Sequence, residues 1–251
     1  AVPAGPVEEV ADERQIELIR GLLRFGLHVQ AAERAQAAGL PAWFRLEVAA
    51  ALRDQGRFAA SIRLAAAVDT AHPDAPGLQY PRAYGKQIED VAARESLDPA
   101  LLFALVREES LFDPSVVSGS GAVGLTQLME EAAADAARPL GLPAYDLRDP
   151  DQNLRLGGRH LARLLARLED VPKSLMAYNA GLSRLRSWES AYAGLPTDLL
   201  LEALPFAETQ SYVRKILVTA ARYDALYFGG SARRTVAMFY PPLADRKGFV
   251  P

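Results

Sequence analysis

Residues 98–110 read DPALLFALVREES, and residues 119–129 read GSGAVGLTQLM. In the first stretch Asp98 can cap a helix, Pro99 suits the first helical position, and apolar residues recur at helical spacing. At about 100° per residue, Glu109 falls near the middle of the apolar stripe of this helix. The two stretches therefore predict a helix that carries a carboxylate on its apolar face and is followed by a glycine-bearing loop.

The place of Glu109 on this helix predicts an unusual acid. A carboxyl group on an apolar face loses hydration of its charged form, so its pKa should rise and it can stay protonated near neutral pH as a general acid. Glu108 points roughly 90° away on the same helical wheel, and we expect it to be an ordinary solvated glutamate. The alternative for Glu109 is that it merely ends the helix and reaches water.

The composition bounds the class of protein. With 251 residues and 50% hydrophobic content, the chain can bury a sizeable core, and we expect one domain plus a smaller unit. The 28 basic and 31 acidic residues give a net charge of −3, which does not favour nucleic acid because that binding relies on phosphate neutralisation. We therefore expect no nucleic-acid partner.

The sequence gives little support for a metal site, a reactive thiol or a membrane-spanning segment. The chain has no cysteine, which excludes disulfides, thiol nucleophiles and thiolate metal sites. Its histidines, His28, His72 and His160, are too far apart in sequence to suggest a metal site, and we expect each at the surface or in a cap. We expect no metal and no cofactor. No apolar run is long enough to span a bilayer, and residues 1–6 lack the order of a signal peptide, although the chain could be mature or trimmed.

Residues 12–71 are rich in Ala, Leu and Arg and predict several short helices joined by tight turns. Within them, GLHVQAAERA at 26–35 aligns weakly with GRFAASIRLA at 56–65. A period of about thirty residues suggests stacked helical hairpins, and the alternative is that any alanine-rich helical pair looks self-similar. The turn-forming stretch TAHPDAPG at 70–77 separates this unit from the rest of the chain.

Beyond residue 77 the sequence shows helical periodicity and no convincing strand alternation. The periodic segments are 83–95, 98–110, 126–138, 153–168, 171–179 and 209–227. We therefore expect an all-α chain with a helical-hairpin segment at 1–76, a second domain at 77–230 and a C-terminal tail at 231–251. Prolines after Tyr240 favour an extended conformation for that tail.

Three further segments hold residues suited to binding a ligand. In 118–124, three glycines permit positive φ and leave the backbone bare, so its amides could meet a ligand, with an ordinary flexible turn as the alternative. Residues 177–181, AYNAG, place a tyrosine and an asparagine where a helix ends at glycine. Residues 205–213, PFAETQSYV, open a helix on which Tyr212 could aim its hydroxyl inward, although a core tyrosine is the commoner fate.

Taken in order, these segments resemble the catalytic domain of the soluble lytic transglycosylases, which share a goose-lysozyme-like fold. The resemblance runs from about residue 80 to residue 227 and rests on four ordered motifs. They are Glu109-Ser110 with Phe112 and Pro114, Gly121-Ala122-Val123-Gly124-Leu125 with Gln127 and Met129, the run at 177–181, and Glu208-Thr209 with Tyr212-Val213. The N-terminal hairpins resemble the end of the α-superhelical domain that precedes the catalytic domain in the large periplasmic members. The expected fold is therefore a lysozyme-like α-helical domain preceded by short helical hairpins.

The resemblance implies that Glu109 is the single catalytic acid and base. It would protonate the glycosidic oxygen between N-acetylmuramic acid and N-acetylglucosamine and then take the proton from the muramic C6 hydroxyl, which closes an anhydro ring. Ser110 would hydrogen-bond near the acid or the substrate, and Gln127 and Met129 would line the groove. The implied substrate-binding set is Ser110, Gln127, Met129, Tyr178, Asn179, Glu208 and Tyr212, in which Tyr178, Asn179 and Tyr212 position the acid and the sugar.

The same resemblance implies peptidoglycan glycan strands as the partner, a monomeric enzyme, and a periplasmic or cell-envelope location. Two positions depart from the usual pattern of the family, because Thr126 stands where Met is common and Glu130 where Pro is common. We therefore expect a less apolar groove floor. Glu130 and Glu131 still suit a helix N-terminus through the helix dipole.

A second carboxylate is missing where a hydrolase would first need one. A two-carboxylate glycosidase requires a partner that holds water or acts as nucleophile, and residues 115–129 contain no Asp or Glu. Asp113, before Pro114, suggests a turn residue. Two alternatives stay open: a goose-type hydrolase on the same fold, and a helical adaptor whose Glu109 groove binds glycan or protein without cleaving it.

Overall fold

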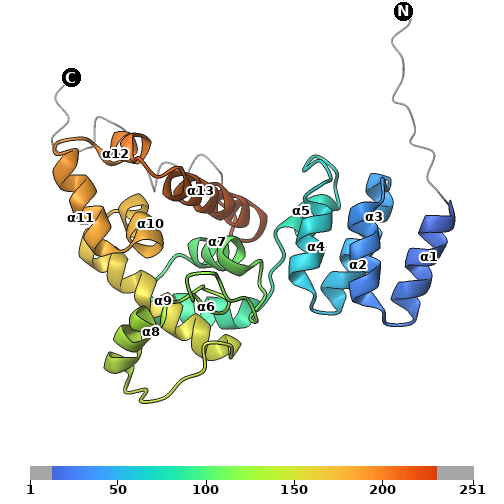
Figure 1. The fold of residues 1–251 in the computed structure, drawn as a ribbon, viewed down its shortest axis with the longest axis horizontal. Coiled ribbons are helices and arrows are strands. Elements are labelled where there is room, and N and C mark those ends of the chain that lie inside the picture. The colour runs from blue at the N-terminus through green and yellow to red at the C-terminus, as the bar shows by residue number, and fades with distance from the viewer. Residues whose placement is uncertain (1–12, 231–251) are drawn as a thin grey trace, which may run out of the picture. The chain divides into compact units, whose positions relative to one another are not determined.

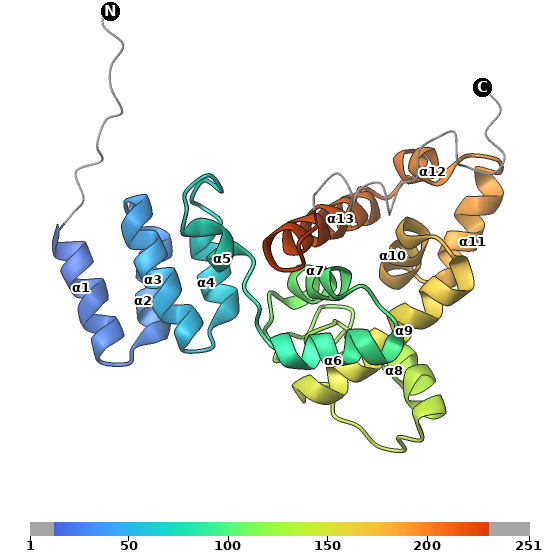
Figure 2. The ribbon, with the colours of Figure 1, turned by 180° about the vertical axis from the view of Figure 1, so that it is seen from behind.

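The computed structural model describes residues 13–230, and its contacts divide the chain into two compact units, residues 1–83 and 84–251. Figures 1 and 2 show that each unit is a group of helices. Across residues 13–230 the backbone pairing of β type is limited to two isolated bridges, Val117 with Val123 and Val123 with Leu128. The prediction of an all-α fold is confirmed.

The first unit consists of short helices that pack as hairpins. They are α1 (Glu13–Arg24), α2 (His28–Ala37), α3 (Ala42–Asp54), α4 (Phe58–Ala65) and α5 (Ala75–Gln79). α1 packs on α2 and α3 packs on α4, with Phe44 and Leu52 in the core. Gly26 and Gly56 adopt positive φ angles of 73° and 70° just before α2 and α4, so the two aligned glycines turn the chain at equivalent places.

The first unit extends beyond the predicted boundary at residue 76. α5 begins inside the turn-forming stretch 70–77 and packs against α3 and α4. The buried Gln79 side chain donates to the carbonyl oxygens of Ala65 at 2.9 Å and Val68 at 2.8 Å. These contacts belong to the first unit, which therefore ends at Ala83.

The second unit contains a larger set of helices arranged around α7 and α9 (Figure 1). They are α6 (Gly85–Glu95), α7 (Pro99–Ser110), α8 (Glu130–Ala137), η1 (a 3-10 helix, Arg138–Leu140), α9 (Pro150–Leu168), α10 (Val171–Ala180), α11 (Leu182–Ala191), α12 (Thr197–Ala203) and α13 (Ala207–Tyr227). α9 packs against α6, α8 and α10, and α13 packs against α7 and α10. The sequence did not predict α11 and α12, because each is short and buries two side chains.

Helix α7 is the most enclosed helix of the site region. The Asp98 carboxylate accepts hydrogen bonds from the amides of Ala100 and Leu101, which confirms the predicted cap. Every residue from Ala100 to Val106 is buried, since α6 and α13 both pack on this helix. α7 is therefore apolar on all sides over that span, and not along a single stripe as predicted. Only its last turn carries charged side chains.

The chain between α7 and α8 folds into a compact loop. Val123 and Leu128 exchange two backbone hydrogen bonds of 3.1 Å, which draws the residues before Glu130 into the loop. The helix predicted over 126–138 consequently begins at Glu130. Glu130 and Glu131 occupy the first turn of α8, in agreement with the predicted N-terminus.

Two further sequence expectations concern the ends of the chain and membranes. The extended tail predicted at 231–251 lies outside the described residues. Within residues 13–230, no helix combines the length and the apolar character that crossing a bilayer would require.

Substitution of the loop glycines should separate backbone strain from steric overlap. Gly124 has a φ of 79°, and an added Cβ would lie 2.2 Å from the carbonyl oxygen of Leu147. Gly124→Ala should therefore lower the free energy of unfolding by roughly 1–3 kcal/mol. Gly121→Ala, with φ of 89° and open space around it, tests the effect of φ alone.

The matched control is Gly119→Ala in the same loop, because Gly119 has no neighbour within 4 Å of an added Cβ and no positive φ. Chemical denaturation of the three variants should rank the losses as Gly124 above Gly121 above Gly119. An equal loss at all three positions would contradict the close packing described for Gly124.

Candidate active site

Glu109 and Tyr212 meet where the last turn of α7 packs against α13. The Tyr212 hydroxyl donates a hydrogen bond of 2.5 Å to Oε1 of Glu109, so this tyrosine faces the acid and does not fill the core. Glu109 is mostly buried but retains some exposed surface. It therefore does not simply end the helix and reach water, which was the alternative considered from the sequence.

Burial raises the pKa of Glu109 from an ordinary 4.5 to about 7. The Tyr212 hydrogen bond opposes this rise because it stabilises the charged carboxylate, while the nearby charge of Glu108 adds to it. The direction agrees with the sequence prediction. A carboxyl group with such a pKa is partly protonated at neutral pH and can act as either acid or base.

Glu108 is not the solvated glutamate that the helical wheel predicted. Its side chain is only 14% exposed, pairs with Arg107, and accepts a 2.8 Å hydrogen bond from the Thr219 hydroxyl on α13. The prediction failed because α13 covers this flank of α7 as well. The two adjacent glutamates therefore have different partners. Glu108 binds the Arg107 guanidinium and the Thr219 hydroxyl, whereas Glu109 accepts a hydrogen bond from Tyr212.

Tyr178 on α10 is the second aromatic hydroxyl near the acid. It donates a 2.9 Å hydrogen bond to the carbonyl oxygen of Thr126 and so fixes the loop before α8. Burial raises the pKa of Tyr178 and of Tyr212, and the negative charge of Glu109 raises both further. Both tyrosines therefore remain hydrogen-bond donors at any pH at which Glu109 titrates.

Asn179 and Glu208 lie at the facing ends of two helices. Oδ1 of Asn179, at the end of α10, accepts a 2.8 Å hydrogen bond from the Thr209 hydroxyl in the first turn of α13. Glu208 precedes Thr209 and is exposed. The structure thus brings Asn179 and the Glu208 segment together through Thr209, a residue quoted in the motif but not predicted to bind.

The side chains of Ser110 and Gln127 donate hydrogen bonds to backbone carbonyl oxygens of the loop. The Ser110 hydroxyl is buried and donates to the carbonyl oxygen of Leu125 at 2.9 Å, which ties the end of α7 to the loop. The Gln127 side-chain amide donates to the carbonyl oxygens of Val116 at 3.0 Å and Gly124 at 2.9 Å. Both residues shape the backbone that a ligand would meet.

Met129 and the loop amides differ in their availability to a ligand. Met129 is 45% exposed just before α8 and can contact a ligand directly. The amides of Gly121 and Gly124, in contrast, donate to the carbonyl oxygens of Ser118 and Val116 within the loop. The expectation that these two glycine amides would be bare is therefore wrong, because the loop satisfies them internally.

Asn153 on α9 is a site-organising residue that the sequence analysis missed. Its fully buried side chain accepts hydrogen bonds from the amide (2.8 Å) and hydroxyl (2.7 Å) of Thr126 and donates to the carbonyl oxygens of Val123 and Leu147 (both 2.9 Å). All of its hydrogen-bonding groups are satisfied. The sequence signal that could have identified Asn153 is a polar amide at the start of the apolar periodic segment 153–168.

The same contacts correct the expectation for Thr126. Its side chain is 0% exposed, bonds to Asn153 and lies against Gly157, where an added Cβ would come within 2.2 Å of the Thr126 hydroxyl. Thr126 therefore does not make the groove floor more polar. Its side chain faces α9, and its carbonyl oxygen receives the Tyr178 hydroxyl.

The remaining sequence expectations concern Asp113 and the histidines. Asp113 accepts hydrogen bonds from the amide and hydroxyl of Ser115, as expected of a turn residue. His160 is neither a surface nor a capping residue: its ring lies 5.1 Å from that of Tyr178, and burial lowers its pKa to about 4. Across the described residues, no group of three or more His, Asp or Glu side chains is placed to hold a metal ion.

Comparison with known proteins gives consistent matches. Residues 86–200 match the Transglycosylase SLT domain. The soluble lytic murein transglycosylase of Escherichia coli K12 is 31% identical over 155 residues, which cover 59% of this chain and 23% of that protein. A transglycosylase of Enterobacteria phage PRD1 is 39% identical over 110 residues, which cover 43% of this chain and 38% of that protein.

Solved structures agree with these relatives. An inactive mutant of the lytic transglycosylase Slt from Pseudomonas aeruginosa matches with a TM-score of 0.72 and 26% identity over 86% of this chain and 37% of that one. The 70 kDa soluble lytic transglycosylase in complex with bulgecin A matches with a TM-score of 0.72 and 25% identity, over 87% of this chain and 36% of that one. The chain thus spans less than half the length of these proteins, and the predicted resemblance and lysozyme-like fold are confirmed.

The raised pKa of Glu109 should make folding stability depend on pH. The folded state binds this proton more tightly than the unfolded state, so wild-type stability is lost as pH rises from about 4.5 to about 7. Glu109→Gln removes that loss. The unfolding free energy of the variant relative to wild type should increase by up to about 3 kcal/mol across this window.

Chemical denaturation below and above the window measures this difference. Glu131→Gln, which removes an exposed carboxylate from α8, supplies the baseline. If the difference between Glu109→Gln and wild type stayed constant with pH, Glu109 would have to be solvated like a surface glutamate.

Proposed function

We propose that this chain belongs to the transglycosylase SLT domain family and is a peptidoglycan lytic transglycosylase that cleaves between N-acetylmuramic acid and N-acetylglucosamine and leaves an anhydromuramoyl end. The observation that carries the proposal is the mostly buried Glu109, held by Tyr212, with a pKa near 7. The similarity to lytic murein transglycosylases supports the choice of substrate and reaction.

In the first step of the proposed reaction, protonated Glu109 donates its proton to the glycosidic oxygen as the bond to C1 of the muramic sugar breaks. The resulting carboxylate then accepts the proton of the C6 hydroxyl, whose oxygen bonds to C1 and closes the anhydro ring. No water is consumed, and Glu109 returns to its protonated form. Because Tyr212 occupies Oε1, we assign the proton transfers to Oε2 of Glu109.

The other residues of the site would orient the sugar and the acid. Tyr212 holds the carboxyl group directly, and Tyr178 acts through the carbonyl oxygen of Thr126 on the loop that carries Gln127. Met129, Asn179 and Glu208 offer exposed groups to the glycan. Ser110 and Gln127 would contribute by fixing the loop backbone.

The environment of the neighbouring carboxylate favours this reaction over hydrolysis. A hydrolase of the two-carboxylate kind needs a second acid that is free to hold water or attack the sugar. Glu108 is the adjacent carboxylate, but Arg107 and Thr219 engage it. A glycan adaptor that does not cleave would need neither the proton of Glu109 nor the hydrogen bond from Tyr212. Digestion of peptidoglycan distinguishes such an adaptor from an enzyme.

The proposed substrate implies where the protein would act. Relatives include both soluble and membrane-bound lytic murein transglycosylases, and murein is a cell-wall polymer. We therefore propose a periplasmic or other envelope location, with peptidoglycan strands as the partner and the monomer as the working form.

Glu109→Gln should abolish cleavage of purified peptidoglycan, with a fall in rate of at least about 100-fold, because the amide keeps the shape and loses the transferable proton. Mass spectrometry of the digest should show anhydro-ended fragments with the wild type alone. Products heavier by one water would identify a hydrolase, and retained glycan binding without any product from the wild type would identify an adaptor.

Tyr212→Phe should lower the cleavage rate by roughly 10- to 100-fold, the effect expected on losing a hydrogen bond to a charged group. The hydrogen bond lowers the pKa of Glu109, so its loss should also move the alkaline limb of the pH–rate profile, near pH 7 in the wild type, to higher pH. Tyr192→Phe, at the end of α11, is the matched hydroxyl deletion. An unshifted profile would reduce Tyr212 to a packing role.

A further inference from the structure

A cavity lined mainly by arginines lies between the end of α8, η1 and α9. Figure 1 shows α8 beside α9, and the two helices are in contact. The volume of the cavity is about 370 Å³, and its lining residues are Asp135, Arg138, Pro139, Arg159 and Arg163. None of the residues assigned to the proposed reaction lines it, so the cavity is separate from the acid site.

Two of these arginines belong to a row along α9. Arg155, Arg159, Arg163 and Arg167 are spaced four residues apart, so they occupy neighbouring positions on the helix surface. Like charges at this spacing repel each other, and Asp151, in the first turn, is the single acidic residue of the helix. The repulsion is therefore not relieved inside α9, which favours an anionic partner from outside the helix.

Contacts from neighbouring helices hold the three guanidinium groups of the cavity in place. Nη1 of Arg159 donates a 2.8 Å hydrogen bond to Oε2 of Glu95 on α6. Nη1 of Arg163 donates to the carbonyl oxygen of Asp135 at 2.8 Å, and Nη2 of Arg138 donates to Oδ1 of Asp135 at 3.2 Å. The last two contacts also complement the negative end of the α8 dipole. Groups that are already oriented lose less entropy when they bind a ligand.

The protein leaves most N–H donors of these guanidinium groups without an acceptor. Each group has five N–H donors. Within residues 13–230, each of the three groups hydrogen-bonds to one acceptor, and Nε of Arg159 is buried without a partner. The lining carries three arginines against one aspartate, and an excess positive charge remains even when Glu95 is counted with them. An anion in the cavity would therefore be attracted and would find unused donors.

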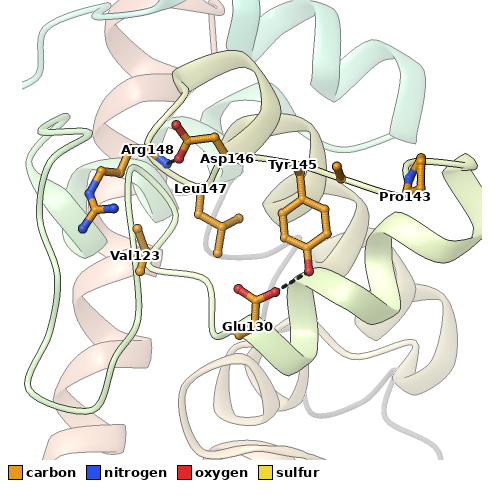
Figure 3. Close-up of a pocket in the computed structure, with 8 residues that line it drawn as sticks. Val123, Glu130, Pro143, Tyr145, Asp146, Leu147 and Arg148 are labelled. Carbon is orange, nitrogen blue, oxygen red and sulfur yellow. Dashed lines mark hydrogen bonds between the residues drawn. The ribbon is translucent and has the colours of Figure 1, made fainter.

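The cavity at the opposite end of α8 has the reverse balance of charge. Its volume is about 450 Å³, and its charged lining residues are Glu130, Asp146 and Arg148. Figure 3 shows these side chains, with the Tyr145 hydroxyl bonded to Glu130. The excess of positive charge is thus a property of the arginine-lined cavity and not of the whole surface around α8.

We propose that the arginine-lined cavity binds a phosphate group, from either inorganic phosphate or an anionic lipid headgroup. A phosphate presents more oxygen atoms than a carboxylate, whose two oxygens a single bidentate arginine satisfies. Three guanidinium groups around one cavity match the larger oxyanion. The bound phosphate would bridge η1 and α9 through Arg138, Arg159 and Arg163. This proposal does not rest on the proposed function, because phosphate binding needs neither Glu109 nor a glycan.

The test is a calorimetric titration of inorganic phosphate into the full chain at constant pH and ionic strength. Arg138→Gln and Arg163→Gln should each weaken binding roughly tenfold through the loss of charge-assisted hydrogen bonds. Arg159 is left unchanged, because its removal would strand the largely buried carboxylate of Glu95. The matched controls are Arg155→Gln and Arg167→Gln, which remove charges from the same helix outside the cavity and should leave the affinity unchanged.

Three results would overturn the proposal: no saturable phosphate binding by the wild type, equal weakening in all four variants, or acetate binding as tightly as phosphate. A second arm distinguishes the two sources of the phosphate by sedimenting the protein with vesicles of phosphatidylglycerol and, separately, of phosphatidylcholine. Binding to the phosphatidylglycerol vesicles alone, reversed by inorganic phosphate and weakened in Arg163→Gln, supports a lipid headgroup. Saturable phosphate binding without vesicle binding supports inorganic phosphate.

Discussion

The enclosure of α7 is the constraint on which the rest of the site depends. Its first turns are buried on all sides, so the helix can neither rotate nor shift without opening the core. Glu109 lies at the point where this enclosure ends, buried enough for its pKa to rise and exposed enough to meet a ligand. The packing of α13 along α7 then brings Tyr212 to Glu109 and Thr219 to Glu108. The different environments of two adjacent carboxylates follow from that one helix contact.

The loop after α7 has a comparable fixed point in Asn153. A fully buried amide is costly unless each of its groups is hydrogen-bonded, and here each one is. The same side chain therefore ties the loop near the acid to the segment that carries Leu147. Tyr178, on α10, adds a hydrogen bond to the carbonyl oxygen of Thr126. The loop beside the acid is thus held by hydrogen bonds from both α9 and α10.

Much of the fold was predictable because its signals are local. Three such features were predicted: the Asp98 cap of α7, the end of α10 at Gly181 and the acidic first turn of α8. Each is set by a few neighbouring residues. The helices that escaped prediction, α11 and α12, are short and show little apolar periodicity. The loop before Glu130 was mistaken for helix because its backbone pairing joins residues that a periodic pattern does not relate.

For the site, the sequence by itself determined that Glu109 follows an apolar helix, that a glycine loop comes next, and that tyrosines and an asparagine occur at later helix ends. Those are properties of spacing along the chain. Only the tertiary structure decided which partner each group received: Tyr212 for Glu109, Arg107 and Thr219 for Glu108, and Asn153 for Thr126. The physical reason is that burial, and the hydrogen bonds that make burial of polar groups tolerable, depend on elements distant in sequence. A helical wheel describes one helix, whereas α13 and α9 set the environment of its charged end.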